Sequence, residues 1–442
     1  MSNVMHSAGF RLPDGTIVEQ LYDPRREIAS FAVRYPNGNT EAGIESYPLG
    51  ERVVEPYDES VLRAGAVLLP GDVGEGKEPT ALLKDIHGFL VKYVDLPEDY
   101  LQLAACYVLF SWVYDAFTVL PYLHLVGDTD SGKTRCLLSI GSICYRAIFA
   151  AGAITPAPVF RMLERYQGTL VLDEADFGDQ SGEWSEIVKI LNSGYHTGFP
   201  VLRMEKVGGR FDPKAYRVYG PKLIASRRPF ADDALTSRCI VVPMRTTRRQ
   251  NIPLNLPPAF QEESLLLRNQ LLAFRFQHLP HLQPKIIYLQ NGREPRLSQI
   301  LSPLHQMMRG QDEFLDNLEK KMQQRLHTDR ASSLAADIVQ ALWGLYATED
   351  KDTPLTMKLI AGQVKQQLTD GGEGEDELKK VTPKRVGSIL RRELGLSECI
   401  YTVAGKNARA LRWNHEEMEY LKARFGLSPV PPDANNGHNV NA

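Results

Sequence analysis

Short apolar runs and longer amphipathic segments alternate between residues 122 and 245. The runs at 123–126, 169–172 and 222–225 have strand length, and each is followed by polar residues. Segments with helical spacing of apolar residues lie between them. Strands that alternate with helices form parallel sheets whose two faces are both covered. The pattern therefore predicts an α/β core in this part of the chain.

The flanking regions have other patterns. Residues 1–75 contain short alternating runs at 16–21 and 28–35, separated by turn signals, which predict a small β-rich module. Helical spacing dominates most of the remainder, and the last residues are polar and rich in proline, as in disordered tails. We expect six regions: an N-terminal module (1–75), a helical leader (80–120), the α/β core (121–248), a helical lid (249–330), a helical domain ending in a hairpin (331–425) and a disordered tail (426–442).

Composition limits the class of protein. With 442 residues the chain is expected to hold about two to four domains. The stretch 101–126 is the most apolar, but Asp115, Pro121 and His124 interrupt it, so a buried helix and strand are expected instead of a membrane span. No signal peptide is recognisable. Scattered cysteines indicate buried free thiols in a reducing, cytoplasmic setting: Cys106, Cys136, Cys144, Cys239 and Cys399.

A phosphate-binding loop is the most specific motif. Residues 127–134 match G-x-x-x-x-G-K-[ST] between an apolar strand and a helix. Backbone N–H groups there would bind ATP phosphates, Lys133 would reach the β- and γ-phosphates, and Thr134 would bind Mg²⁺. The alternative is a chance match in an ordinary loop. The predicted nucleotide-binding residues are Gly127, Asp128, Thr129, Asp130, Ser131, Gly132, Lys133 and Thr134.

Two acids follow a second strand, about 40 residues after the lysine. In Gly168-Thr-Leu-Val-Leu-Asp173-Glu174, both carboxylates would lie at the carboxyl end of a strand, beside the phosphate loop. Asp173 would hold Mg²⁺ and Glu174 would orient and polarise the attacking water. A strand that simply ends in solvated acids is the alternative.

The next motifs resemble AAA+ ATPases. Lys222-Leu-Ile-Ala-Ser226 looks like their sensor 1 strand, although asparagine is commoner there and Arg227 could share the role. Asp232-Asp-Ala-Leu-Thr-Ser-Arg238 looks like their arginine-finger helix, so the resemblance implies that Arg238 reaches a neighbouring subunit's γ-phosphate. By the same resemblance Arg296 is assigned to the sensor 2 helix, with Arg293 as competitor. A surface or salt-bridged arginine is the alternative for Arg238, and a plain solvated helix start is the alternative for Arg296.

A hairpin predicted at 200–219, turning at Gly208-Gly209, lies just before the sensor 1 strand. MCM-type hexameric helicases carry a hairpin at this place that projects into the central pore. The resemblance implies that Lys206 and Arg210 contact the DNA backbone. An ordinary surface hairpin with solubilising charges is the alternative.

The C-terminal domain resembles a winged helix. Three helices are predicted at 335–346, 356–368 and 382–394, the last with Thr382 as N-cap, before a two-stranded wing at 401–413. From 379 to 424 there are eleven Lys/Arg and five Glu, a local charge of +6 within a chain of net charge −3. A structural or regulatory module is the alternative. The candidate DNA-binding residues are Lys384, Arg385, Arg391, Lys406 and Arg409.

The order of these motifs over 80–425 resembles MCM-like AAA+ helicases of mobile elements and phages. The resemblance implies an AAA+ P-loop NTPase with helical lid and winged helix, acting as a homo-hexameric, ATP-driven DNA helicase in replication. Its expected partners are DNA and copies of itself, with a primase or polymerase as further candidates and no membrane. Two alternatives remain: an initiator, loader or defence switch that binds DNA without unwinding it, and a protein remodeller.

Overall fold

The computed structural model describes residues 4–151, 154–175, 182–286, 288, 293–308, 312–331, 333–348, 354–370, 375–403, 406–411 and 415–425. The chain forms two compact units, Met1–Glu319 and Lys320–Ala442. The predicted boundaries at 75, 120 and 248 all lie inside the first unit, and the one at 330 lies inside helix α10. The predicted tail at 426–442 lies outside the described residues.

A six-stranded sheet forms the centre of the first unit, with strand order β15-β9-β14-β11-β10-β8. All neighbours pair in parallel except β8, which pairs with β10 in antiparallel orientation at the edge. The prediction of a mixed α/β fold with a parallel core is confirmed. The strands are β8 (Val67–Leu68), β9 (Tyr122–Val126), β10 (Ala147–Ala150), β11 (Leu170–Leu172), β14 (Lys222–Ser226) and β15 (Cys239–Pro243).

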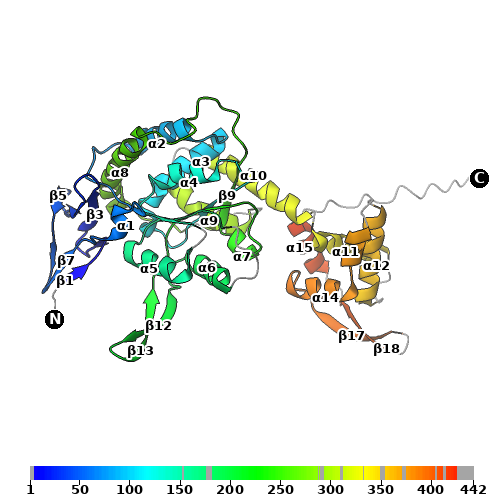
Figure 1. Ribbon diagram of the computed structural model, residues 1–442. Helices are drawn as coiled ribbons and strands as arrows, with labels where there is room; N and C mark the ends of the chain where they lie inside the picture. Colours follow the sequence, from blue (N-terminus) through cyan, green and yellow to red (C-terminus); the bar gives the residue numbers. More distant parts are fainter. Residues whose placement is uncertain are drawn as a thin grey trace, which may run out of the picture. The chain divides into compact units, whose positions relative to one another are not determined.

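Helices lie on both faces of this sheet (Figure 1). Helix α3 is buried along most of its length, as expected of a segment as apolar as 101–111. Among the described residues, no helix combines the length and the apolar character needed to cross a lipid bilayer. The helices are α1 (Ser60–Arg63), α2 (Pro79–Tyr93), α3 (Glu98–Ser111), α4 (Lys133–Gly141), α5 (Pro156–Tyr166), α6 (Gly182–Ser193), α7 (Asp233–Thr236), α8 (Ala259–His278) and α9 (Pro295–Met307).

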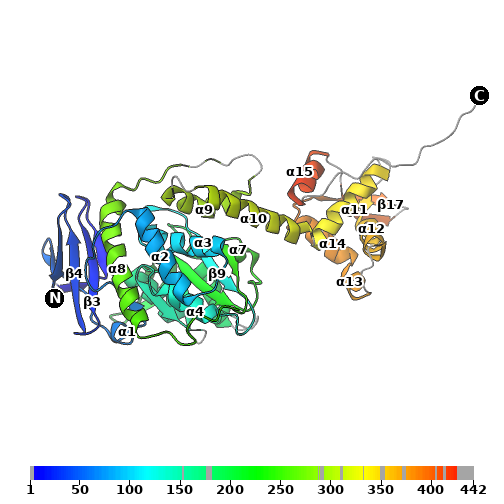
Figure 2. The same cartoon turned by 90° about the horizontal axis from the view of Figure 1, so that it is seen from above.

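The N-terminal strands form two small antiparallel-rich sheets, in the orders β2-β3-β4-β5 and β1-β7-β6. Both views place β3 close to α8, and Figure 2 shows β4 beside it (Figures 1 and 2). Buried Glu19 of β3 pairs with Arg146 and with Arg275 of α8, both at 2.6 Å, which joins these strands to the core. Their bounds are β1 (Val4–His6), β2 (Gly9–Arg11), β3 (Ile17–Asp23), β4 (Ile28–Arg34), β5 (Thr40–Ile44), β6 (Tyr47–Leu49) and β7 (Arg52–Glu55).

The hairpin expected before β14 is present. Strands β12 (Val201–Val207) and β13 (Arg210–Tyr216) pair only with each other, separate from the main sheet. Gly208 and Gly209 have φ values of +58° and +88°. A two-residue turn with positive φ at both positions is the type that matches strand twist, and glycine adopts it without steric cost.

The second unit contains α11 (Leu334–Thr348), α12 (Met357–Asp370) and α14 (Pro383–Arg392), close to the three predicted helices. The Thr382 hydroxyl accepts a hydrogen bond from the Arg385 N–H, as expected for the N-cap. Part of the predicted wing, including Gly405, Arg412 and Trp413, lies outside the described residues. The other elements are β16 (Leu355–Thr356), α13 (Glu375–Lys380), β17 (Glu398–Val403), β18 (Lys406–Leu411) and α15 (His415–Phe425), after α10 (Asp312–Ala331), which spans both units.

Candidate nucleotide site and candidate nucleic-acid interface

The predicted phosphate loop lies at the carboxyl end of β9 and leads into α4. Its tight path requires left-handed backbone at Asp130 and Gly132, whose φ values are +63° and +82°. A Cβ atom at Gly127 would lie 2.6 Å from the Met244 carbonyl oxygen, so only glycine fits there without a shift of the backbone. The loop is therefore held closely against the end of β15.

Helix α4 begins at Lys133, and no side chain caps its first N–H groups. Uncapped N–H groups and the helix dipole make such an end suitable for an anion. The Lys133 ammonium lies 2.7 Å from the Gly127 carbonyl oxygen and 2.6 Å from that of Asp128. The cation is thus held within the curve of the loop, where phosphate groups would bind.

Two acids follow β11, and the first of them contacts α4. The Thr134 hydroxyl donates a hydrogen bond of 2.7 Å to Asp173 Oδ2. The other carboxylate oxygen, Oδ1, accepts from the Glu174 N–H at 2.9 Å. Glu174 is exposed and has a φ of +54°, an unfavourable conformation for a residue with a side chain. The turn therefore directs one acid toward α4 while the next remains in solvent.

Strand β14 separates β9 from β11, so the phosphate loop and the acids are two strand spacings apart, about 10 Å. The amides and ammonium on one side suit a triphosphate. The hydroxyl and carboxylate that meet at Thr134 and Asp173 are the hard oxygen donors that Mg²⁺ prefers. The residues present at this edge of the sheet fit ATP with Mg²⁺.

Ser226, the predicted sensor 1 residue, is buried at the end of β14, in register with Val126. Its hydroxyl donates to the Arg228 carbonyl oxygen and accepts from His124 Nε2, both at 2.6 Å. Ser226 thus lies beside the phosphate loop, and its role as sensor 1 stays a prediction. Its hydroxyl bonds within the protein. No motif in the sequence indicated the contact with His124.

Arg238, the predicted finger, lies at the opposite edge of the sheet. It directly precedes β15, and its carbonyl oxygen accepts from the Tyr122 N–H at the first residue of β9. Five strand residues separate it from its own phosphate loop, a span of about 17 Å. An arginine side chain is shorter than this. Arg238 therefore cannot contact phosphate groups bound by its own loop.

Tyr195 brings Arg238 and Arg296 together. The Arg238 guanidinium lies 4.3 Å from the centroid of the Tyr195 ring and that of Arg296 lies 5.2 Å from it. Arg296 also contacts the Tyr195 hydroxyl at 3.2 Å. Such cation–π contacts fix the direction of long side chains. No motif in the sequence marked Tyr195 for this role.

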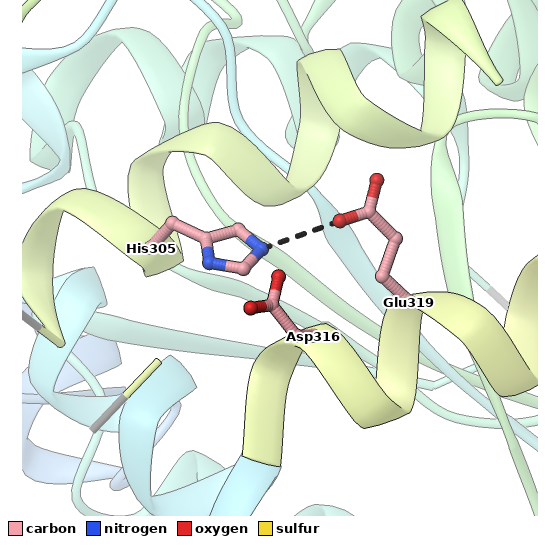
Figure 3. Close-up of side chains that lie close together, drawn as sticks. All are labelled: His305, Asp316 and Glu319. Carbon is pink, nitrogen blue, oxygen red and sulfur yellow. Dashed lines mark ion pairs between the residues drawn. The ribbon is translucent and has the colours of Figure 1, made fainter. Parts of the chain in front are cut away.

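Arg293, the competitor for sensor 2, binds acids of α10. It lies 2.5 Å from Glu319 and 3.1 Å from Asp316, and His305 lies 3.5 Å from Glu319 (Figure 3). Burial opposes ionisation of Glu319, but His305, Ser298 and Arg293 outweigh it and lower its pKa. His305, Asp316 and Glu319 could hold a metal ion by spacing. The guanidinium already compensates their charge, so the group is better explained as an ion-pair cluster between α9 and α10.

Lys206 and Arg210 lie near the tip of the hairpin, but on opposite faces. Lys206 is directly opposite Phe211, whereas Arg210 is directly opposite Val207. Directly opposite residues share a face, and successive residues alternate between faces. The two predicted DNA-binding cations therefore cannot grip one strand from the same side of the hairpin.

Helix α14 of the second unit has one apolar and one basic face. Val386, Ile389 and Leu390 are buried in the core of this unit. The predicted DNA-binding residues Lys384, Arg385 and Arg391 are all exposed, as is Arg409 on β18. Lys406 begins β18, but its side chain lies outside the described residues.

Four of the five cysteines are buried free thiols, as expected, and the fifth, Cys399, is exposed on β17. Burial raises the pKa of Cys106, Cys136 and Cys144 to about 12, so these thiols stay protonated and inert near neutral pH. The expectation that every cysteine is buried was wrong for Cys399, which lies on an exposed part of β17.

No known protein family and no curated protein matches the chain. Among solved structures, the SCCmec type IV Cch active helicase matches with a TM-score of 0.45 and 13% identity, over 96% of this chain and 81% of that one. The apo C-terminal region of NrS-1 matches with a TM-score of 0.34 and 13% identity, over 89% and 96%. The Aeropyrum pernix ORC1 protein in complex with DNA matches with a TM-score of 0.23 and 14% identity, over 79% and 96%.

Proposed function

We propose that this protein is an AAA+ ATPase that translocates along DNA and unwinds it as a ring-shaped oligomer. The observation that carries this proposal is the 2.7 Å hydrogen bond between Thr134 and Asp173. It joins the phosphate loop to the acid pair at one edge of the sheet, although 39 positions separate the two residues in sequence. This is the arrangement that hydrolysis of a nucleoside triphosphate requires.

We propose a different role in ATP hydrolysis for each residue at this edge. The α4 N–H groups and Lys133 bind and orient the triphosphate, and Thr134 with Asp173 would hold Mg²⁺, which neutralises phosphate charge when bound. Glu174, exposed and next to Asp173, positions a water molecule and accepts its proton. Ser226 lies between the two groups at the end of β14 and is the sensor 1 residue of the proposal.

The position of Arg238 supports an oligomer. Because its own phosphate loop lies at the far edge of the sheet, Arg238 can act on a phosphate only in another subunit. Contacts that join different surfaces of identical subunits form rings when the rotation closes. We propose a homo-hexamer in which Arg238 completes the neighbouring ATP site, with Arg296 beside it as sensor 2.

Two basic elements support DNA as the polymer that is moved. The hairpin β12–β13 projects from the core with Lys206 and Arg210 near its tip (Figure 1). In the second unit, α14 presents exposed cations on the face opposite its core. We propose that the second unit is a winged helix bound to DNA, and that the protein acts in replication of a mobile element or phage.

A forked DNA duplex with one labelled strand tests the proposal. The wild-type protein should hydrolyse ATP faster when single-stranded DNA is added and should release the labelled strand in an ATP-dependent manner. Lys133→Ala serves as the control and should do neither. A wild-type ATPase that does not respond to DNA would contradict the proposal.

A second candidate is a DNA-bound switch, such as an initiator or loader, which hydrolyses ATP without unwinding. The basic face of α14 favours it, because a compact DNA-binding unit can anchor a protein at one place on DNA. DNA-stimulated ATPase without release of the labelled strand would support this candidate over the helicase.

A further inference from the structure

One face of the hairpin is apolar and exposed. Leu202 and Phe211 are each 67% exposed and Met204 is 61% exposed. The register places Leu202 opposite Ala215, Met204 opposite Pro213 and Lys206 opposite Phe211. These three pairs share one face, which we call the apolar hairpin face: Leu202, Met204, Lys206, Phe211, Pro213 and Ala215.

The other face of the hairpin is anchored to the core. Glu205 pairs with Arg161 of α5 at 3.1 Å, and Arg203 pairs with Glu186 of α6 at 2.9 Å. Tyr216 is buried against Phe160, with ring centroids 4.6 Å apart. These contacts fix the hairpin so that the apolar hairpin face points away from α5 and α6. An exposed apolar face that does not contribute to the core of its own chain is typical of an interaction surface.

The apolar hairpin face carries a positive charge, which favours a ligand with negative charge. Lys206 is its only charged residue, and among the residues that the structure describes Lys206 forms no ion pair. Beside it are an exposed aromatic ring and a flexible thioether. A cation next to an aromatic platform matches a single DNA strand, which offers a phosphate and an unpaired base at each nucleotide. Duplex DNA conceals the faces of its bases and offers the phosphates alone.

We propose that the apolar hairpin face binds unpaired bases of single-stranded DNA. Phe211 stacks on a base, Met204 and Leu202 extend the apolar surface along the strand, and Lys206 contacts a phosphate. This proposal rests on the proposed function and specifies it further: the translocating hairpin holds a single strand, and holds it partly through its bases. Arg210, on the opposite face, does not take part in this stacking.

Two other occupants fit less well. If the apolar hairpin faces of two subunits packed against each other, their two Lys206 side chains would come close and repel. Such a symmetric contact also joins only two subunits and cannot continue around a ring. Packing onto the opposite face of a neighbouring hairpin is obstructed, because α5 and α6 hold Arg203 and Glu205 there. An unfolded polypeptide could use the apolar side chains, but it would give Lys206 no regular partner.

The test compares two strands that differ only in their bases. Binding of fluorescent oligo(dT) and of an abasic oligonucleotide of the same length is measured by anisotropy with the Glu174→Gln protein and ATP. Phe211→Ala in this background should weaken binding of oligo(dT) about tenfold and change binding of the abasic strand less than twofold. Phe211→Trp should restore binding of oligo(dT). Lys206→Ala should weaken binding of both strands equally, because it removes a phosphate contact.

Each other result is informative. If the Phe211→Ala variant binds both strands like its parent, or weakens both equally, base stacking is wrong while the proposed function stands. If the parent protein binds neither strand, both proposals fail. Loss of the oligomer in Phe211→Ala, measured by sedimentation, would assign the face to a second copy of the chain. ATPase stimulation by unfolded casein that Phe211→Ala abolishes would assign it to polypeptide.

Discussion

Substitutions at Lys133 and Glu174 test the binding of ATP and its hydrolysis separately. Lys133→Ala removes the cation held inside the phosphate loop, so nucleotide binding should weaken and turnover should be lost. Glu174→Gln leaves the loop intact and removes only the carboxylate that we propose as the base. The variant should therefore bind ATP normally and hydrolyse it at least about 100-fold more slowly. Binding of a fluorescent ATP analogue and steady-state phosphate release measure the two effects. A Glu174→Gln variant with normal turnover would assign the base to another residue.

His124 makes stability dependent on pH. Burial lowers its pKa to about 3, whereas an unfolded histidine has a pKa near 6.5. Below pH 6.5 the unfolded chain binds a proton that the folded protein does not, so the free energy of unfolding should decrease as the pH falls. The expected slope is about 1.4 kcal/mol per pH unit between pH 6.5 and pH 3.

Urea unfolding at pH 7.0 and pH 5.5 checks this prediction against His124→Asn. Asparagine keeps a side-chain N–H for Ser226 but does not titrate. Other groups contribute to the pH dependence of both proteins, so the difference between them isolates His124. The wild-type protein should lose about 1.4 kcal/mol more than the variant over this range. Equal losses would mean that His124 takes up its proton in the folded state as well.

At the scale of single residues, the sequence indicated the candidate nucleotide site because most of its groups belong to short motifs, and the roles of these groups stay predictions. A glycine-rich loop places Lys133 and Thr134 by local geometry, and a strand places Asp173 beside them. His124 and Tyr195 could not be found in this way. His124 contacts Ser226 and Tyr195 contacts Arg296, each about 100 positions away in sequence. Neither His124 nor Tyr195 belongs to a short motif.

Among the elements, strand β3 depends on one buried carboxylate. Glu19→Gln removes the buried carboxylate that pairs with Arg146 and that shares the compensation of Arg275 with Asp115. The change should lower the free energy of unfolding by about 3–5 kcal/mol, chiefly because Arg146 loses its partner. The control is Glu262→Gln, which breaks an exposed 2.8 Å pair with Arg25 and should cost less than about 1 kcal/mol. Urea midpoints of the two variants measure the difference. Similar small losses for both would show that Glu19 is not needed to join β3 to the core.

The sequence predicted elements well where local signals are strong. Thr382 and Pro383 begin α14, and Gly208-Gly209 fixes the hairpin turn and thereby its register. That register places Lys206 opposite Phe211 and puts Arg210 on the other face. Because side chains alternate between the two faces of a strand, the sequence and the turn together could have predicted this arrangement. Helices α13 and α15 were missed because both are rich in charge, and α13 is also only six residues long. The attachment of β3 to α8 depends on residues 256 positions apart, beyond the range of any local pattern.

At the scale of the whole molecule, mixing experiments test the position of Arg238. Arg238→Ala should be almost inactive, because each site lacks its neighbour's guanidinium. Lys133→Ala should also be inactive, but a mixture of the two should regain part of the wild-type turnover at interfaces that combine an intact loop with an intact Arg238. Phosphate release measured across mixing ratios checks this. A mixture as inactive as either variant would contradict action between subunits.

The sequence predicted a separate C-terminal domain beginning at residue 331, and the second unit of the structure begins at Lys320. Charge and turn signals suggested boundaries at 75, 120 and 248, but buried contacts such as Glu19 with Arg275 hold these segments in one unit. Local patterns identify where one kind of element gives way to another. They do not reveal which elements share a core, because that depends on contacts between distant residues.

Strand β15 begins directly after Arg238 and ends directly before Met244. The Met244 carbonyl oxygen lies so close to Gly127 that a residue with a side chain would not fit there. It pairs with β9 over its full length, and the Met244 N–H bonds to the Val126 carbonyl oxygen. If Arg238 contacts the triphosphate of an adjoining subunit, as we propose, the five residues of β15 connect that contact to the phosphate loop of its own subunit. Occupancy of one nucleotide site would then affect the geometry of the next.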